Sequence, residues 1–143
     1  MNTYKYIVLT ILCLTLSSCS KTFEENNTDP FVGKYSVSVT QHVVWGGSSG
    51  TLTDSGVLRI SRVSSTKVKT TGYFHTTGEV VGSTIYFESM YASDSAGYFT
   101  TTFDAATLNG NVLTFKTHRS GQLEYGGIMY PYRSTDNFTL IKQ

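Results

Sequence analysis

Residues 98–118 have the sequence YFTTTFDAATLNGNVLTFKTH, and this stretch decides the expected fold. At 98–103 and again at 113–118, apolar residues alternate with polar ones. Alternation with a period of two predicts β-strands that bury one face. Between them lies Asn109-Gly110, which suits a tight hairpin turn because both central residues of such a turn need positive φ. The stretch therefore predicts a hairpin, and only Asp104 to Leu108 could make a helical turn.

The same alternation recurs along the rest of the chain. It covers residues 35–40, 58–61, 67–74, 84–88 and 138–141. Turn signals separate these segments: Gly46-Gly47, Thr77-Gly78, Gly82-Ser83, Ser120-Gly121 and Gly126-Gly127. An antiparallel meander must protect its edges, and closure removes them. We expect an all-β domain, an antiparallel up-and-down β-barrel of about eight strands, with an open two-sheet β-sandwich as the alternative.

The N-terminus carries a different pattern. An apolar run from Tyr6 to Leu16 follows Lys5, and the run ends at Ser17-Ser18-Cys19. Its length fits the core of a secretory signal and is too short to span a bilayer. The segment before Cys19 resembles the bacterial lipoprotein consensus. That resemblance implies cleavage before Cys19, a diacylglyceryl thioether on its sulfur and acylation of its amine, which together anchor a protein stably.

This interpretation divides the chain into three parts. Residues 1–18 are a lipoprotein signal peptide, residues 19–30 a lipidated flexible tether, and residues 31–143 the β-domain. The eleven residues after Cys19, from Ser20 to Pro30, reach about 15–20 Å as a coil, enough to hold a domain just off a membrane. Ser20 is not the aspartate that retains some lipoproteins at the inner membrane, so we expect the outer membrane, with the periplasmic side and the cell surface both open.

Composition excludes several functions. Loss of Lys5 with the leader leaves ten basic and ten acidic residues, so the domain offers no basic footprint for nucleic acid. Cys13 lies in the leader and Cys19 is used by lipid, which leaves no thiol for a disulfide, a metal or a nucleophile. We expect no cofactor.

No catalytic or metal-binding pattern stands out, and we do not expect an enzyme. Gly46-Gly47-Ser48-Ser49-Gly50 matches the nucleophile elbow, but that motif needs a strand before the serine and a helix after it. A glycine-serine hairpin loop explains the match. His42, His75 and His118 fall on outward phases of separate segments, without the spacing of a helical zinc site.

The two ends of the β-domain resemble a known family. Phe31-Val32-Gly33-Lys34-Tyr35 resembles the Gly-x-Trp opening of lipocalins, with Tyr35 at the position of the tryptophan. Asn137 to Lys142 is similar to their last barrel strand. The chain thus resembles the small lipocalin-like (calycin-type) β-barrel lipoproteins of Gram-negative bacteria. The resemblance implies a ligand-binding barrel, and Arg133 stands near the position of the late arginine of the family.

Aromatic residues suggest how the domain is used. The alternation places Phe74, Phe87, Phe99, Phe103, Phe115 and Phe138 inside. An eight-stranded barrel holds side chains or one small ligand, so these rings indicate a closed core or a shallow pocket at one mouth.

Two hypotheses follow for the mature protein. In the first, Trp45, Tyr91 and Tyr130 line the mouth of the barrel and bind a small apolar ligand, with His42 and Arg133 as polar partners. In the second, the aromatic residues near the loops contact an envelope protein, and the domain binds no small molecule. In both, lipid on Cys19 attaches the protein to the membrane.

Overall fold

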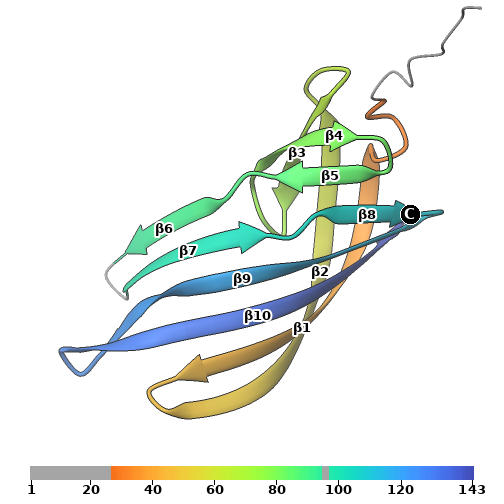
Figure 1. The fold of residues 1–143 in the computed structure, drawn as a ribbon. Coiled ribbons are helices and arrows are strands. Elements are labelled where there is room, and N and C mark those ends of the chain that lie inside the picture. Colours follow the sequence, from red (N-terminus) through yellow and green to blue (C-terminus); the bar gives the residue numbers. More distant parts are fainter. Residues whose placement is uncertain (1–26, 95–96) are drawn as a thin grey trace, which may run out of the picture.

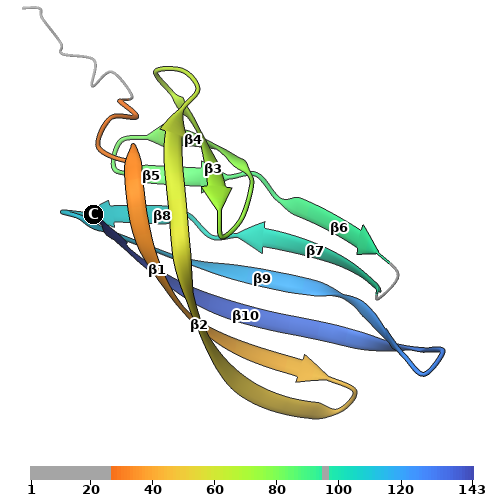
Figure 2. The same cartoon turned by 180° about the vertical axis from the view of Figure 1, so that it is seen from behind.

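The computed structural model describes residues 27–94 and 97–143, so Cys19 and the predicted leader lie outside the described residues. The described chain forms ten antiparallel strands in one sheet (Figures 1 and 2). They are β1 (Gly33–Trp45), β2 (Ser48–Arg62), β3 (Lys67–Gly72), β4 (Thr77–Val81), β5 (Thr84–Phe87), β6 (Met90–Asp94), β7 (Gly97–Phe103), β8 (Ala106–Asn109), β9 (Val112–Tyr125) and β10 (Ile128–Lys142). The predicted all-β class is confirmed.

Eight of these strands close into a barrel-like ring. Neighbours in the sheet run β10, β1, β2, β3, β4, β5, β8 and β9, and β9 pairs with β10 to complete the circle. The strands follow one another along the chain except between β5 and β8, where β6 and β7 intervene. The ring contains eight strands, and it is consistent with the predicted all-β class.

The β6–β7 hairpin extends the sheet outside this ring. β9 pairs with β8 through residues 112–114 and with β7 through residues 117–123, so β8 and β7 lie one after the other along the same edge. The long ring strands continue past the end of the ring and form a curved open sheet with this hairpin (Figure 1). The order of strands in the open sheet is β2, β1, β10, β9, β7 and β6. The β1–β2 and β9–β10 hairpins project at its far end, turning at Gly46-Gly47 and Gly126-Gly127 as predicted.

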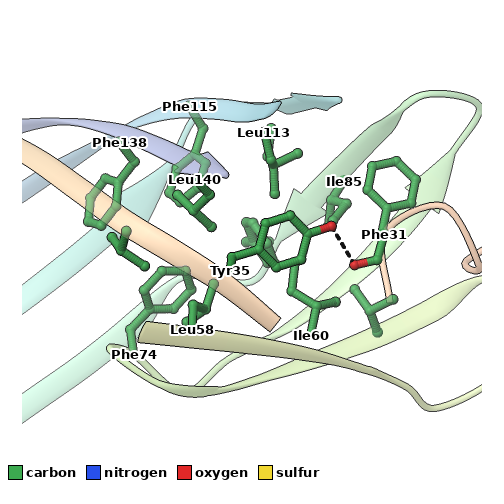
Figure 3. Packing of buried hydrophobic residues seen from close by; sticks show 14 of the residues in the cluster. Phe31, Tyr35, Leu58, Ile60, Phe74, Ile85, Leu113, Phe115, Phe138 and Leu140 are labelled. Atoms are coloured by element: carbon green, nitrogen blue, oxygen red, sulfur yellow. Dashed lines mark hydrogen bonds between the residues drawn. The ribbon is translucent and has the colours of Figure 1, made fainter. Parts of the chain in front are cut away.

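Aromatic rings fill the interior of the ring. Phe74, Phe87, Phe115 and Phe138 are all at most 9% exposed. The rings of Phe115 and Phe138 stack with centroids 4.7 Å apart, and Phe74 contacts both of them edge-on (Figure 3). The aliphatic part of the core includes Val37, Val39, Leu58, Ile60, Val68, Val80, Ile85, Leu113 and Leu140. These side chains leave the closed ring packed, as the phase of the phenylalanines predicted.

The other two phenylalanines predicted inside are less buried: Phe103 still packs against Phe74, Phe87 and Phe115, and Phe99 lies outside the ring. Phe103 is partly buried against the edge of the cluster. Phe99 is half-buried on the open sheet, where its ring lies 5.3 Å from that of Tyr132. Both residues belong to β7, which lies outside the ring. The alternation of apolar residues shows which face of β7 continues the inner face. It does not show whether other strands of the ring cover that face.

The chain before β1 covers one end of the ring. Phe31 and Tyr35 are fully buried, and the Tyr35 hydroxyl donates a 2.7 Å hydrogen bond to the carbonyl oxygen of Phe31 (Figure 3). Burial raises the pKa of Tyr35 to about 12. Thr28 is also buried, and its hydroxyl donates to the carbonyl of Ser64. Packed structure therefore extends back into the last residues of the predicted tether.

The structure corrects several local predictions. The stretch Asp104 to Leu108, the one segment that could have made a helical turn, makes none, because Ala106–Asn109 forms β8 and pairs with β9. The predicted turns at Thr77-Gly78 and Ser120-Gly121 are wrong, since both lie inside strands. The hairpin predicted at Asn109-Gly110 forms one residue later, with Asn109 opposite Val112 and positive φ at Gly110 alone.

Close packing explains the two misassigned glycines. A Cβ on Gly121 would lie 1.9 Å from the Tyr98 carbonyl oxygen, and one on Gly78 would lie 2.7 Å from Ile85 Cγ2. Glycine in a strand marks close approach of neighbouring atoms as well as a turn. These positions need glycine for its small size.

Candidate functional site

A cleft of about 980 Å³ opens beside the ring. Its walls come from β3, the β3–β4 connection, the first residue of β4, the β5–β6 connection, β6, β7 and one residue of β9. The lining residues are Lys69, Thr70, Thr71, Tyr73, Phe74, His75, Thr76, Thr77, Glu88, Ser89, Met90, Tyr91, Ala92, Phe99, Thr101 and Arg119. The cleft forms because the β6–β7 hairpin leaves the ring and stands apart from the β3–β4 connection.

Tyr73 joins the cleft to the core. Its ring lies edge-on to Phe138 with centroids 5.8 Å apart, and its hydroxyl donates a 2.7 Å hydrogen bond to Asp54 Oδ2. Burial chiefly, followed by this hydrogen bond and by the charges of Asp54 and Asp136, raises the pKa of Tyr73 to about 12, against an opposing effect of Arg119. The hydrogen bond from Tyr73, with a second from the Ser55 amide, lowers the pKa of Asp54. Tyr73 is thus a neutral hydrogen-bond donor at physiological pH.

Polar side chains continue the inner face of β9 and β10 beyond the core. Arg119 lies opposite Ser134 in the strand pair, and Thr117 lies opposite Asp136, one step closer to Phe138. Asp136 is only 2% exposed and its Oδ2 accepts a 3.2 Å hydrogen bond from the Thr117 hydroxyl. Asp136 Oδ1 and Ser134 Oγ have no hydrogen-bond partner among the described residues. A polar strip with unsatisfied groups therefore lies next to Arg119.

A second hollow lies at the far end of the open sheet. It measures about 170 Å³ and is lined by Trp45, Gly46, Ser48, Tyr125 and Tyr130. The Trp45 ring packs edge-on against Tyr125 and Tyr130, with centroids 5.8 and 6.2 Å apart. Of the residues predicted to line a barrel mouth, Trp45 and Tyr130 are thus brought together, at the hairpin tips.

The other three predicted ligand-binding residues are not part of this group. His42 is exposed and shares a 3.0 Å hydrogen bond with Thr51. Arg133 is exposed between the buried Tyr132 and Ser134, so it points to the outer face of β10. Tyr91 is 69% exposed on the edge strand β6, where it contributes to the rim of the large cleft. The prediction of one common mouth for all five residues is wrong, because β10, β9 and β7 separate β1 from β6.

Metal and nucleophile chemistry gain no support from the described part of the chain. It contains no group of three or more His, Cys, Asp or Glu side chains that could hold a metal ion. His42, His75 and His118 are exposed, as expected, and His118 Nε2 lies 3.4 Å from Asp104 Oδ1. Ser48 begins β2 directly after the Gly46-Gly47 turn, which is a hairpin and not a strand-to-helix elbow.

Comparison with known proteins gives no assignment: no protein-family model and no curated protein matches the chain. Within residues 27–94 and 97–143, no helix is long and apolar enough to cross a membrane.

Three residues in or near the cleft were missed from the sequence: Tyr73 and Arg119, which line it, and Asp136, which is buried against Thr117 outside the lining. A usable signal existed for two of them. Arg119 continues the inward phase of Leu113, Phe115 and Thr117, and Asp136 continues that of Phe138 and Leu140. A charged residue on the buried phase of a strand is costly unless it is paired or serves a site. Tyr73 gave no such signal, because a loop determines its position.

Proposed function

We propose that this protein is a lipid-anchored binding module that holds a small, largely apolar molecule in the 980 Å³ cleft. The lipid is carried by Cys19 and attaches the module to the bacterial outer membrane. The anchor rests on the sequence from Lys5 to Cys19, and the binding function rests on the cleft. The outer-membrane location and the likeness to lipocalin-like lipoproteins belong to the same proposal.

The cleft is the observation that carries this proposal. Small-molecule sites are concave, mostly apolar, and contain a few polar groups that fix orientation; they commonly enclose about 300–1,000 Å³. Here Phe74, Met90 and Phe99 supply apolar surface, and Arg119 and several threonines supply polar groups. Inside the ring, the space is occupied by phenylalanines whose rings contact one another. A ligand therefore binds beside the barrel-like ring and not in a deep central cup.

The direction of the chain supports this use of an anchor. The first described residues (orange) and the β1–β2 and β9–β10 hairpin tips lie at opposite ends of the molecule (Figures 1 and 2). A tether from Cys19 would hold the end of the ring that Phe31 covers toward the bilayer. The open sheet and its cleft would then face away from the membrane, where a ligand or partner can reach them.

The chain from Ser20 to Gln143 tests the proposal, since it lacks Cys19 and retains every described contact. Native mass spectrometry of this chain from the producing cells should show a retained small mass, and the purified protein should bind the apolar dye N-phenylnaphthylamine. Ala92→Trp places a bulky ring in the cleft and should abolish dye binding. Ser93→Trp, on the neighbouring position of β6 outside the lining, should leave it intact. A lack of both ligand and dye binding would exclude the proposed function.

The hairpin tips favour a second candidate, an envelope or cell-surface protein-interaction module. Trp45, Tyr125, Ile128 and Met129 are between 37% and 68% exposed at the tips of two adjacent hairpins. Tyrosine and tryptophan are enriched in the central residues of protein interfaces. If this candidate holds, crosslinking in intact cells captures a specific partner with the wild-type protein. The Trp45→Ala variant should no longer capture this partner, whereas the Ala92→Trp variant should still capture it.

A further inference from the structure

We propose that the ligand of the cleft is a single-chain amphiphile with an anionic head, and that its alkyl chain leaves the cleft and lies along the open sheet as far as Trp45. Arg119 would bind the head inside the cleft. The inference rests on the proposed function, and it names the class of ligand and its orientation for the same site.

The strand register joins the cleft to the hollow at the hairpin tips. Phe99, which lines the cleft, lies opposite Gly121 of β9, and Gly121 lies opposite Tyr132 of β10. Gly121 has no side chain, and the rings of Phe99 and Tyr132 contact each other across this position with centroids 5.3 Å apart. Tyr132 in turn lies opposite Trp45 of β1. Because residues opposite each other share one face of a sheet, the cleft and the hollow open on the same face.

An apolar stripe connects the two sites on this face. Side chains alternate between the faces of a strand, so Leu123 and Tyr125 share the face of Arg119. Tyr130 shares the face of Tyr132. The stripe consists of Phe99, Tyr132, Leu123, Tyr130, Trp45 and Tyr125, and none of these residues is charged.

The length of the stripe favours a long chain over a compact ligand. A strand rises about 3.3–3.4 Å per residue, so β9 from Arg119 to Tyr125 covers about 20 Å. The Trp45 ring lies 5.8 Å from that of Tyr125, at the far end of this path. A compact ligand in the cleft would leave the stripe in water, whereas a long alkyl chain would bury it and gain free energy with each CH₂ group.

The distribution of charge sets the orientation of the ligand. The lining of the cleft contains two cationic side chains, Lys69 and Arg119, and one carboxylate, Glu88. Arg119 is half-buried and has no carboxylate within 4.0 Å among the described residues. A guanidinium fits a carboxylate or a phosphate through two parallel hydrogen bonds. The head therefore belongs in the cleft, and the chain runs toward Trp45.

Trp45 provides the test, because it is the only tryptophan in the chain and lies at the far end of the stripe. The probes are 5-doxylstearate and 16-doxylstearate, which carry a quenching nitroxide near the carboxylate or near the chain end. They are added to the Ser20–Gln143 chain below the concentration at which they aggregate. Both should displace N-phenylnaphthylamine, and at equal occupancy 16-doxylstearate should cause the larger loss of Trp45 fluorescence.

Arg119→Met tests the head group. The variant should bind dodecanoate about tenfold more weakly in isothermal titration calorimetry, because hydrogen bonds to charged groups contribute this much or more. Its affinity for dodecan-1-ol should not change. Arg133→Met is the matched control, because Arg133 is exposed on the outer face of β10, and it should change neither affinity.

Leu123→Asp tests the path of the chain. A carboxylate on the stripe should weaken binding of 16-doxylstearate, because burying an unpaired charge is unfavourable, and should leave N-phenylnaphthylamine in the cleft. Ser120→Asp is the matched control on the exposed outer face of β9 and should change neither.

The outcomes separate this inference from the proposed function. If both stearates displace the dye and 16-doxylstearate does not quench Trp45 more strongly, the chain does not follow the stripe and the inference fails, while the binding function stands. An unchanged affinity of Arg119→Met for dodecanoate would overturn the assignment of the head. If neither the stearates nor the dye bind, the proposed function fails as well. The wild-type comparison of the two stearates decides even if a variant fails to fold.

Discussion

Replacing Tyr35 with phenylalanine should destabilise the domain and remove part of its sensitivity to alkaline pH. The Tyr35 hydroxyl donates to the carbonyl oxygen of Phe31, and both residues are fully buried. Tyr35→Phe preserves the packing of the ring and leaves that carbonyl without its partner. A buried polar group that loses its hydrogen bond costs about 1–3 kcal/mol. For a domain of this size, each kcal/mol lowers the Tm by about 3–5 °C.

The pH dependence provides a second and more specific measure. The pKa of Tyr35 rises from its ordinary 10.0 to about 12 in the folded protein. Its contribution to stability is therefore present below pH 10 and is lost as the pH rises through 12. A shift of two pKa units at 1.36 kcal/mol each corresponds to about 3 kcal/mol of unfolding free energy. Tyr35→Phe should remove that part of the decline.

Urea unfolding at pH 7, 9, 10, 11 and 12 measures both effects for the wild type and the variant. Tyr73 also has a raised pKa, so the variant should keep some alkaline sensitivity. The expected result is a stability difference of about 1–3 kcal/mol at pH 7 that shrinks above pH 10. Equal stability at pH 7, together with the same decline above pH 10, would refute the role assigned to the Tyr35–Phe31 hydrogen bond.

Three further predictions concern the cleft and the open sheet. Tyr73→Phe should raise the pKa of Asp54 toward its ordinary value, because it removes the hydrogen bond that chiefly lowers it; NMR titration of the carboxyl measures this, and an unchanged pKa would exclude the bond. Gly121→Ala should lower the free energy of unfolding by about 3 kcal/mol and detach β7, because the new Cβ would collide with the Tyr98 carbonyl. The control Gly50→Ala has open space around its Cβ and should change the free energy of unfolding by less than about 0.5 kcal/mol in the same urea assay. Trp45→Ala should cost about 1 kcal/mol through two lost ring contacts and leave N-phenylnaphthylamine binding unchanged; a loss of dye binding would place the site at the hairpin tips.

The strand alternation predicts much of this fold because one face of each strand in the ring is buried. Val37, Val39, Leu58 and Ile60 are buried while their neighbours are exposed, as the period-two pattern requires. The same alternation of apolar and polar residues continues in β7, outside the ring. The sequence pattern does not change there, and for this reason Phe99 was expected inside. Alternation reports which side a residue faces, and closure depends on pairings between distant strands.

The candidate site was less predictable for a related reason. Trp45 and Tyr130 could be grouped because both lie near glycine-rich turns, whereas the cleft depends on where the β6–β7 hairpin leaves the ring. The sequence shows that Tyr91 and Arg133 lie near loops or strand ends. It does not show that Tyr91 lies on the edge strand β6 and Arg133 on the outer face of β10. The inward phase of Arg119 and Asp136 is the one local sign that the polar strip exists.

The most direct test of the account is a two-dimensional ¹H–¹⁵N NMR titration of the Ser20–Gln143 chain with N-phenylnaphthylamine. The account predicts shifts in the amides of residues that line the cleft, with little change at Trp45 and Tyr125. The lining residues are 69–71, 73–77, 88–92, Phe99, Thr101 and Arg119. Shifts centred on the hairpin tips, or no shifts at saturating probe, would contradict the assignment of this cleft as the binding site.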